Sequence, residues 1–448
     1  FFSEARGPLC LGVVLATVTA KRTPGAMSRG ATGPRDQVGV ATLAANTSGD
    51  IAPALSPQQI KAARCSYPPV PAKCVVTGGS GFVGQRLVEM LVERGAERVV
   101  SFDILPAPPG AWRDARIEYV EGDLRSFEAV ALAVRGADCV WHLGAAVGPF
   151  HPPRLYQEVN VEGTQHVVKA CRHAGVPKIV MSSSPSTRFD GRDIEGLSET
   201  ELPSIPQKRY LQEYAETKAA GELLVTGACC DELLTVAVAP HQVYGPRDTL
   251  FLPNMLETAA TGKLRVFGSG RNRVCFTHVD NYCHGLILAE RALFKDSPAL
   301  AQFYICTDAD THTYPDGYCE LWLELDKAVV GVGFQSLFSK FHLPWVLMVF
   351  LGYLCGFIGF VLGKKLKLNP FTVKMLTMNR WFTFDRADRD LGYTPIIGFQ
   401  EGWADTIDWF RTQWLPSYLN REKASGYGQI YTGSQHKIDM QDKKRPLM

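Results

Sequence analysis

Residues 73–84 read KCVVTGGSGFVG, and this stretch decides the fold. The run KCVVTG is short, apolar and β-branched, so it predicts a buried strand, and the residues from Phe82 to Arg94 predict an amphipathic helix. Between them Gly78, Gly81 and Gly84 form a glycine-rich turn. Missing Cβ atoms there let the backbone approach an anion closely, so the turn predicts a pyrophosphate site facing the N-terminus of the helix.

Acidic residues end the two strands that follow. RVVSFD predicts a second strand ending at Asp103, whose carboxylate can accept hydrogen bonds from both hydroxyls of an adenosine ribose. Asp103 would repel a 2′-phosphate, so NAD is favoured over NADP, although the residue could also be an ordinary strand-end turn residue. The expected cofactor-binding residues are Gly78, Gly81, Phe82, Val83, Gly84, Asp103, Asp123, Leu124, Ala145, Tyr214 and Lys218, with Asp123 and Leu124 expected at the adenine.

The same alternation of apolar runs and amphipathic stretches continues to Pro240. The further strand-like runs are RIEYVEGD, DCVWHLGAA, VPKIVMSSS and LLTVAVAP. Continuous apolar strands separated by helices indicate a parallel sheet covered on both faces. We therefore expect an α/β fold, a Rossmann-type doubly wound parallel sheet, with a smaller C-terminal substrate-binding region and a membrane-associating hydrophobic segment.

Composition excludes several other classes. With 46% apolar and 21% charged residues the 448-residue chain can bury a full core. Its 47 Lys and Arg against 45 Asp and Glu leave a net charge of +2, which gives no footprint for nucleic acid. The 12 cysteines contain no C-x-x-C pair, which argues against a zinc site or any other metal site of this kind and against a secreted disulfide scaffold.

Tyr214 and Lys218, in YAETK, lie four residues apart on a predicted helix and so share one face. A nearby ammonium and a positive nicotinamide would stabilise the phenolate and lower the pKa of the tyrosine, making it a usable base. Taken alone, this spacing occurs by chance in many helices and would indicate a surface pair. Downstream of a dinucleotide turn it predicts an acid-base pair.

With these pieces in place, residues 73–411 resemble the extended short-chain dehydrogenase/reductases, and within them the 3β-hydroxysteroid dehydrogenase family. The stretches SSSPSTRFDG, DIEGLSETELP and YAETKAAGE look most like the members that oxidise and decarboxylate sterol 4α-carboxylates. LGYTP and the stretch to Trp414 match the family's closing region. VAPHQVYGPRD and RVCFTHVDN match in part, with Ala239 where an Arg is common and Cys275 where an Asp is usual.

The resemblance implies roles for four residues. The family's catalytic tyrosine and lysine fall on Tyr214 and Lys218, its serine falls on Ser184, and its helix asparagine, a positioning residue, falls on Asn160. Ser182 and Ser183 remain alternatives to Ser184. The implied reaction is NAD-dependent oxidation of a 3β-hydroxyl, followed by loss of CO2 from the resulting β-keto acid.

Three other functions stay open. Two are a 3β-hydroxysteroid dehydrogenase/isomerase without decarboxylation and a nucleotide-sugar epimerase or dehydratase. The third is a silent NAD-binding scaffold in a membrane complex.

The segment 343–363 (LPWVLMVFLGYLCGFIGFVLG) carries no charge over 21 residues, which would extend about 31 Å as a helix. Because LGYTP follows it and should return to the catalytic domain, we expect a monotopic or re-entrant hairpin on the cytosolic face of the endoplasmic reticulum, not a span. Expected partners are a sterol, the lipid surface, other sterol demethylation enzymes and a second copy of the chain, with no nucleic acid.

The expected division of the chain follows from these segments. It is a disordered or targeting extension (1–70), an NAD-binding domain (71–245), a substrate-binding part (246–340), a membrane-associating segment (341–367), a closing region (368–418) and a polar tail (419–448).

Overall fold

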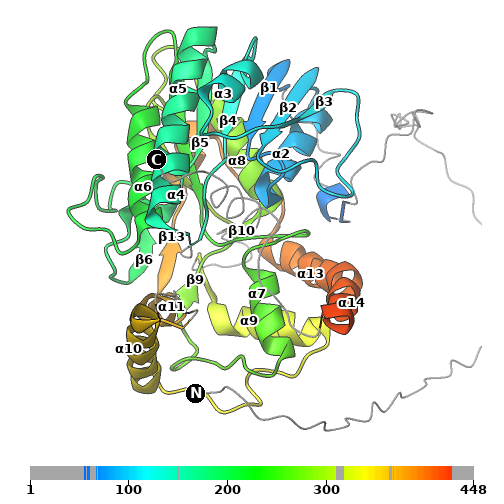
Figure 1. Ribbon diagram of the computed structural model, residues 1–448, viewed down its shortest axis with the longest axis vertical. Coiled ribbons are helices and arrows are strands. Elements are labelled where there is room, and N and C mark those ends of the chain that lie inside the picture. Colours follow the sequence, from blue (N-terminus) through cyan, green and yellow to red (C-terminus); the bar gives the residue numbers. More distant parts are fainter. Residues whose placement is uncertain are drawn as a thin grey trace, which may run out of the picture. The chain divides into compact units, whose positions relative to one another are not determined.

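A seven-stranded sheet organises the computed structural model, which describes residues 55–56, 58–60, 67, 69–148, 151–308, 317–362, 366 and 368–425 (Figure 1). All its strand pairs are parallel, in the order β11-β7-β5-β4-β1-β2-β3. The strands are β1 (Lys73–Thr77), β2 (Arg98–Asp103), β3 (Ile117–Glu121), β4 (Cys139–His142), β5 (Lys178–Ser182), β7 (Leu234–Pro240) and β11 (Phe303–Cys306). The order reverses between β1 and β4, the place where such sheets bind ligands.

Helices cover both faces of this sheet, as the continuous apolar strands predict. One apolar core joins the sheet to α2 (Phe82–Glu93) and α8 (Val279–Arg291). The other core joins it to α3 (Phe127–Ala133), α5 (Gly163–Ala174) and α6 (Glu213–Thr226). Ahead of α5 lie α4 (Pro153–Tyr156) and the π-helix η1 (Gln157–Glu162). The predicted Rossmann-type sheet is confirmed.

The large sheet takes elements from later in the chain than expected. Strand β11 pairs with β7, and α8 packs on the sheet, so part of the range 246–340 belongs to this sheet and not to a separate substrate-binding part. The closing LGYTP stretch also returns to it. Tyr393 is buried, and its hydroxyl donates to the Thr307 carbonyl oxygen over 3.1 Å.

A smaller four-stranded sheet, in the order β12-β9-β13-β6, forms the second layer of strands. Its members are β6 (Ile194–Leu197), β9 (Arg273–Val274), β12 (Cys319–Glu320) and β13 (Arg380–Phe382). Two further strands, β8 (Val243–Tyr244) and β10 (Thr277–His278), pair with each other. The remaining elements are the 3-10 helix η2 (Pro185–Arg188), α7 (Leu252–Ala260), α9 (Leu321–Val332), α12 (Asp385–Leu391), α13 (Phe399–Trp409), the π-helix η3 (Phe410–Trp414) and α14 (Leu415–Ser425).

The apolar segment forms one continuous helix, α10 (Trp345–Val361), beside the short α11 (Pro370–Met375) (Figure 1). The expected hairpin within 343–363 is therefore wrong. Leu343 is held in a β-bridge with Phe267, so the helix begins only after Pro344. Among the described residues, no helix combines the length and the apolarity needed to cross a bilayer.

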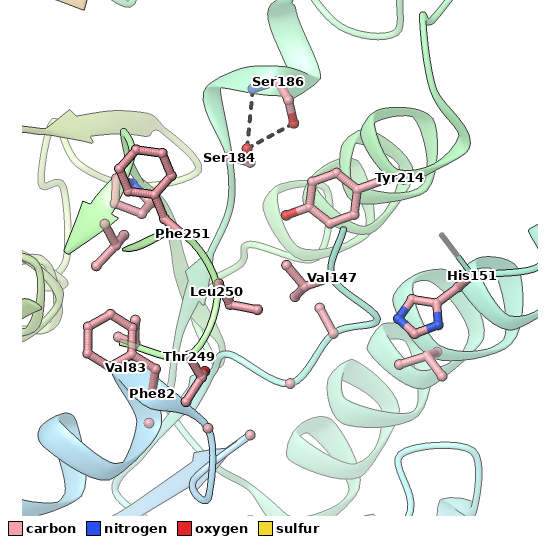
Figure 2. Close-up of a pocket in the computed structure, with 18 of the residues that line it drawn as sticks. Phe82, Val83, Val147, His151, Ser184, Ser186, Tyr214, Thr249, Leu250 and Phe251 are labelled. Carbon is pink, nitrogen blue, oxygen red and sulfur yellow. Dashed lines mark hydrogen bonds between the residues drawn. The ribbon is translucent and has the colours of Figure 1, made fainter. Parts of the chain in front are cut away.

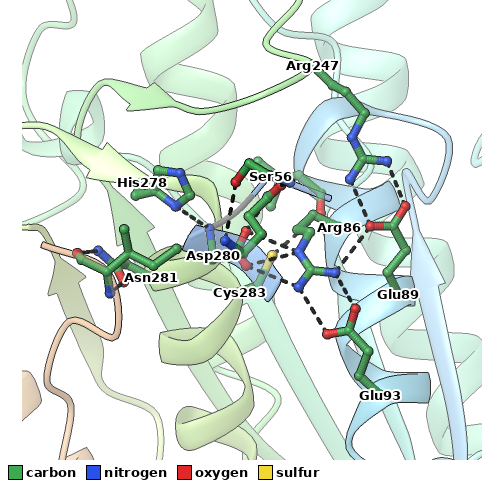
Figure 3. Close-up of polar contacts among 12 residues, drawn as sticks. Ser56, Arg86, Glu89, Glu93, Arg247, His278, Asp280, Asn281 and Cys283 are labelled. Carbon is green, nitrogen blue, oxygen red and sulfur yellow. Dashed lines mark hydrogen bonds and ion pairs between the residues drawn. The ribbon is translucent and has the colours of Figure 1, made fainter. Parts of the chain in front are cut away.

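Arg86 anchors α2 through a buried charge network (Figure 3). Its side chain is 1% exposed, and its guanidinium donates to Asp280 on α8 and to Glu89 and Glu93 on its own helix. Arg247 adds a second guanidinium, with bonds of 2.6 and 2.8 Å to Glu89. The network therefore joins α2, α8 and the segment that follows β8.

A short piece of the N-terminal stretch also packs on this network. Gln59 is fully buried and donates a 2.7 Å hydrogen bond to Asp280 Oδ1. The ring of Tyr67 lies 4.1 Å from the guanidinium carbon of Arg94. The expectation that residues 1–70 stay outside the packed fold therefore does not hold for these residues, while residues 1–54 lie outside the described part.

Candidate active site

A cavity of about 490 Å³ lies at the carboxyl ends of the parallel strands, where the strand order reverses. It is lined by the glycine turn, by the ends of β2 and β3, by the Ser184 turn and α6, and by segments of the smaller sheet (Figure 2). Ten of the eleven expected cofactor-binding residues line it, all except Lys218: Gly78, Gly81, Phe82, Val83, Gly84, Asp103, Asp123, Leu124, Ala145 and Tyr214. We call this cavity the pocket.

The glycine turn has no room for side chains. Gly78 has φ +74°, and a Cβ there would lie 2.7 Å from the Gly144 nitrogen. A Cβ on Gly84 would lie 2.0 Å from the Gly78 carbonyl oxygen. The close packing of α2 against the turn therefore requires glycine at both positions, and it leaves the N-terminus of α2 open to the pocket.

Acidic groups at the ends of β2 and β3 are fixed by local bonds. Asp103 accepts from the backbone nitrogens of Ser80 (3.0 Å) and Leu105 (2.9 Å), which ties the second strand to the glycine turn. Asp123 accepts from the Arg125 guanidinium over 2.8 Å, and Arg125 also pairs with Glu158. This end of the pocket therefore presents two oriented carboxylates beside the apolar Leu124.

Tyr214 enters the pocket from the first turn of α6, with its hydroxyl on the side of Ser184 and Leu250 (Figure 2). Its ring packs edge-on against Tyr156, with ring centroids 6.3 Å apart. Burial raises the pKa of Tyr214 to about 12, and a hydrogen bond with Ser184 opposes part of that rise. In the protein alone the shift is thus opposite to the lowering that the sequence analysis expects.

Lys218 lies one turn further along α6 and is buried. Its ammonium donates a 2.7 Å hydrogen bond to the Ser182 carbonyl oxygen at the end of β5. Burial lowers the pKa of Lys218 to about 8, while Glu222 opposes the shift. Lys218 therefore fixes α6 against the sheet directly behind the tyrosine.

The three candidate serines have different partners. Ser182 pairs with the Tyr282 hydroxyl at 2.8 Å, and Ser183 donates to Glu222 over 2.5 Å. Ser184 instead lines the pocket, where it bonds Ser186 at 2.8 Å and interacts with Tyr214. The geometry favours Ser184 over its two neighbours as the serine that meets a substrate oxygen.

Asn160 lies in η1, buried behind the pocket wall. Its side chain bonds both backbone groups of Ala146, at 2.8 Å to the nitrogen and 3.2 Å to the oxygen, and donates to the Thr217 hydroxyl over 3.2 Å. It therefore fixes the segment after β4 against α6, next to Lys218.

Sequence reasoning missed the residues that the smaller sheet and its neighbours contribute to the pocket. They include His241, Gln242, Val243, Asp248, Thr249, Leu250, Phe251, Ile194, Arg380 and Phe382. His241 lies inside the VAPHQVYGPRD stretch and Leu250 follows it, but that stretch matches the family only in part. Arg380 carries no local signal, because its place in the pocket depends on β13 pairing with β6, far away in sequence.

Comparisons with known proteins agree with this architecture. Residues 75–330 match the model of the "3-beta hydroxysteroid dehydrogenase/isomerase family". The chain is 34% identical to the Arabidopsis thaliana "3beta-hydroxysteroid-dehydrogenase/decarboxylase isoform 1", over 75% of this chain and 79% of that one. It is 32% identical to the Homo sapiens "Sterol-4-alpha-carboxylate 3-dehydrogenase, decarboxylating", over 76% and 88%.

Solved structures share the fold at lower identity. One is "MoeE5 in complex with UDP-glucuronic acid and NAD", with a TM-score of 0.57 and 23% identity over 76% of this chain and 99% of that one. Another is a Streptomyces venezuelae dTDP-glucose 4,6-dehydratase, DesIV, with a TM-score of 0.57 and 21% identity over 76% and 97%. At these identities the likeness concerns the architecture alone.

Proposed function

The chain belongs to the 3-beta hydroxysteroid dehydrogenase/isomerase family, and on that basis we propose that it oxidises the 3β-hydroxyl of a 4α-carboxysterol to a 3-ketone with NAD, with loss of CO2. The observation that carries the proposal is that Tyr214, Ser184 and the glycine turn line one pocket. Relatives named as decarboxylating sterol dehydrogenases support the choice of substrate class.

The residues present fit a dinucleotide. The glycine turn has no room for a Cβ at Gly78 or Gly84, and it opens the N-terminus of α2 to the pocket, which suits a pyrophosphate. Asp103 would hold the adenosine ribose, and Asp123 and Leu124 would border the adenine. When bound, NAD supplies the acceptor for a hydride and a positively charged ring.

The chain's own groups handle the proton and the orientation. Tyr214 takes the proton of the 3β-hydroxyl as the C3–H bond breaks and the C3–O double bond forms. Ser184, which interacts with Tyr214, donates to the 3-oxygen and aligns it. Lys218 fixes α6 through its bond to the Ser182 carbonyl oxygen and would meet the cofactor's ribose, and its charge lies one turn from the phenol. Because the pKa of Tyr214 is raised to about 12, chiefly by burial, the phenol depends on positive charge nearby to act as a base.

Loss of CO2 needs no further residue. Oxidation at C3 leaves a carboxylate β to a ketone, so the C4–carboxylate bond can break with its electrons moving onto the new carbonyl oxygen. Proton uptake at C4 then completes the ketone. The pocket has only to keep the 3-oxygen hydrogen-bonded while this happens.

One assay separates the alternatives: NADH and CO2 measured together from a 4α-carboxysterol with NAD. Equal amounts of both support the proposal, and NADH without CO2 selects a plain dehydrogenase. The absence of both products would contradict the proposal and leave a nucleotide-sugar enzyme or a silent scaffold. Tyr214→Phe is expected to lower the rate by about 10²- to 10⁴-fold. A Tyr214→Phe protein that reduced NAD at the wild-type rate would refute the assigned role.

We also propose that α10 docks the protein on the cytosolic surface of the endoplasmic reticulum membrane. Its outward face carries Phe350, Tyr353, Phe357 and Phe360, which are 63%, 66%, 65% and 84% exposed. The opposite face packs closely on α11, where a Cβ on Gly352 would lie 3.3 Å from the Asn369 carbonyl carbon. An apolar helix with one packed and one exposed face suits insertion into a lipid surface, where an insoluble sterol resides.

Vesicle flotation tests the docking. Phe350→Asp combined with Phe357→Asp is expected to abolish most binding to phosphatidylcholine/phosphatidylserine vesicles. Leu132→Asp, at a 62% exposed leucine of α3, is the matched control and should bind as wild type. Equal flotation of all three proteins would contradict the proposal, and protection of the C-terminal tail from protease in sealed microsomes would contradict the surface topology.

A further inference from the structure

Arg380, on β13, lines the pocket without an acidic partner. Its Nη1 donates to the Met375 sulfur over 2.8 Å, and its buried Nε has no hydrogen-bond partner. Among the described residues no carboxylate pairs with it. A thioether is a weak, uncharged acceptor, so most of the five N–H groups of the guanidinium are left without a strong partner.

This contrasts with the other guanidinium that lines the pocket. Arg125 is bonded to Asp123 and Glu158, and even the fully buried Arg86 has three carboxylates around it. Burial lowers the pKa of Arg380 to about 10, so the group remains charged at neutral pH. A partly buried cation without a counter-charge is costly in a protein, and an anionic ligand group would offset that cost.

The surroundings of Arg380 restrict what that ligand can be. The adjoining core cluster is apolar and contains Ile194, Phe303 and Phe382. His241 also lines the pocket, and its Nδ1 donates to the Cys275 carbonyl oxygen over 2.7 Å, while its buried Nε2 has no partner. Burial lowers the pKa of His241, and the charge of Arg380 lowers it further, so the two side chains lie within electrostatic range. The combination suits a molecule with an apolar body and one anionic group.

The position in the fold places this cation on the substrate side of the pocket. Arg380 lies opposite Ile194 in the β13·β6 pair, and β6 follows the Ser184 turn and η2 along the chain. The glycine turn, where the pyrophosphate belongs, is on the large sheet. Arg380 and the reactive Tyr214–Ser184 pair therefore border the same cavity from different sheets.

We propose that Arg380 binds the carboxylate of the substrate and so selects acidic 3β-hydroxysterols over neutral ones. The inference rests on the proposed function and deepens it. A guanidinium presents a planar fork of donors that matches a carboxylate in a bidentate pair. A site built to pair with a charged group rejects the analogue that lacks it, because its own polar atoms then stay unpaired.

The test compares a 4α-carboxy-3β-hydroxysterol with its methyl ester, each delivered in cyclodextrin to the NADH-loaded protein. Binding is measured by calorimetry for wild type, Arg380→Gln, Arg380→Lys and Arg273→Gln. Arg273 is the matched control, because it lies on the neighbouring β9 with its side chain 43% exposed and does not line the pocket. Arg380→Gln is expected to weaken binding of the acid by about 10- to 100-fold and to leave the ester unchanged. Arg380→Lys should fall between, and Arg273→Gln should match wild type.

Other results would overturn the inference. One is that Arg380→Gln binds the acid as tightly as wild type does. Another is that Arg380→Gln, with a wild-type melting curve, loses affinity for the acid and for the ester equally. The third is that Arg380→Gln loses as much affinity for NADH as for the acid. Arg380→Lys, which keeps the charge, decides the matter if the glutamine variant does not fold, because it should weaken the acid and not the ester. Failure of the proposed function would give a different result: the wild-type protein would bind the acid through Arg380 but would form no NADH from it.

Discussion

Lys218 donates a 2.7 Å hydrogen bond to the carbonyl oxygen of Ser182. The bond joins the helix that carries Tyr214 to the strand that leads into Ser184. The two residues that meet the substrate oxygen in the proposed reaction are therefore positioned by one buried ammonium. Its removal should affect both the geometry of the site and the pH dependence of stability.

Lys218→Met is expected to flatten the alkaline rise in stability. The folded-state pKa of Lys218 is lowered to about 8 from 10.5. Between these values the unfolded chain keeps the proton that the folded chain has released, so raising the pH favours the folded state. From pH 8 to 9.5 the contribution to the free energy of unfolding is about 2 kcal/mol. Urea titrations should show this rise in stability in wild type and in Lys263→Met, a variant of an exposed lysine that serves as the control. A rise of the same size in Lys218→Met would contradict the prediction.

Gly84→Ala should destroy the dinucleotide site. The new Cβ would lie 2.0 Å from the Gly78 carbonyl oxygen, a backbone atom that cannot rotate away. The turn must open, so NADH affinity measured by fluorescence is expected to fall by more than about 10-fold, with a lower melting temperature. Gly356→Ala is the control, since its Cβ would meet Pro370 at an ordinary 3.5 Å. Normal NADH binding by Gly84→Ala would contradict the assignment of the turn.

Asn160→Ala should loosen the wall of the pocket. It leaves the backbone groups of Ala146 and the hydroxyl of Thr217 without this partner, at a cost of about 1–3 kcal/mol for each buried group left unsatisfied. We expect a lower free energy of unfolding and a reduced kcat, while the apparent pKa of the pH–rate profile stays unchanged. Asn420→Ala, at an exposed position of α14, should have no effect. A shifted profile would instead give Asn160 a direct part in proton transfer.

Arg86→Met should destabilise the fold and reverse its response to acid. Three carboxylates, Asp280, Glu89 and Glu93, lose their shared cation, at an expected cost of about 3–5 kcal/mol. In wild type the pKa of Asp280 is lowered, chiefly by Arg86 against the effect of burial, so acid below pH 4 weakens the fold.

In the Arg86 variant the buried Asp280 carboxylate loses the main charge that lowers its pKa, so burial favours its protonated form and stability should rise as the pH falls from 7 to 5. Arg98→Met, which breaks an ion pair that is 51% exposed on both sides, should cost less than about 1 kcal/mol. Denaturant midpoints at the two pH values measure both effects. An Arg86→Met protein that lost stability on acidification would show that the cluster is not held by this guanidinium.

The sequence alone predicted those parts of the fold that depend on local patterns of residues. Strands β1 to β5 and β7, the glycine turn and the shared face of Tyr214 and Lys218 all follow from short apolar runs and spacing. It did not predict those parts that depend on pairing between segments far apart in the sequence. Strand β11 is only four residues long, and its membership of the large sheet depends on pairing with β7. The 21-residue uncharged run gave a 17-residue helix, because Leu343 is held by a bridge to Phe267.

The site shows the same division. Motifs predicted the residues on the dinucleotide side of the pocket. Arg380 matters because it has no acidic partner in the described structure, and the spacing of residues in the sequence cannot indicate the lack of a partner. The direction of the Tyr214 pKa could not be read from an adjacent lysine either. In the fold the ammonium bonds the Ser182 carbonyl, and desolvation of the phenol dominates.

The pairing of β6 with β13 has a consequence for biosynthesis. All seven strands of the large sheet lie before residue 307, so they can assemble while the ribosome is still translating the apolar helix. Strand β6 must wait for β13, which is made after α10. A nascent chain would therefore hold a formed nucleotide half and an open substrate half at the moment α10 emerges, so the proposed docking of α10 on lipid would precede the closing of the substrate chamber.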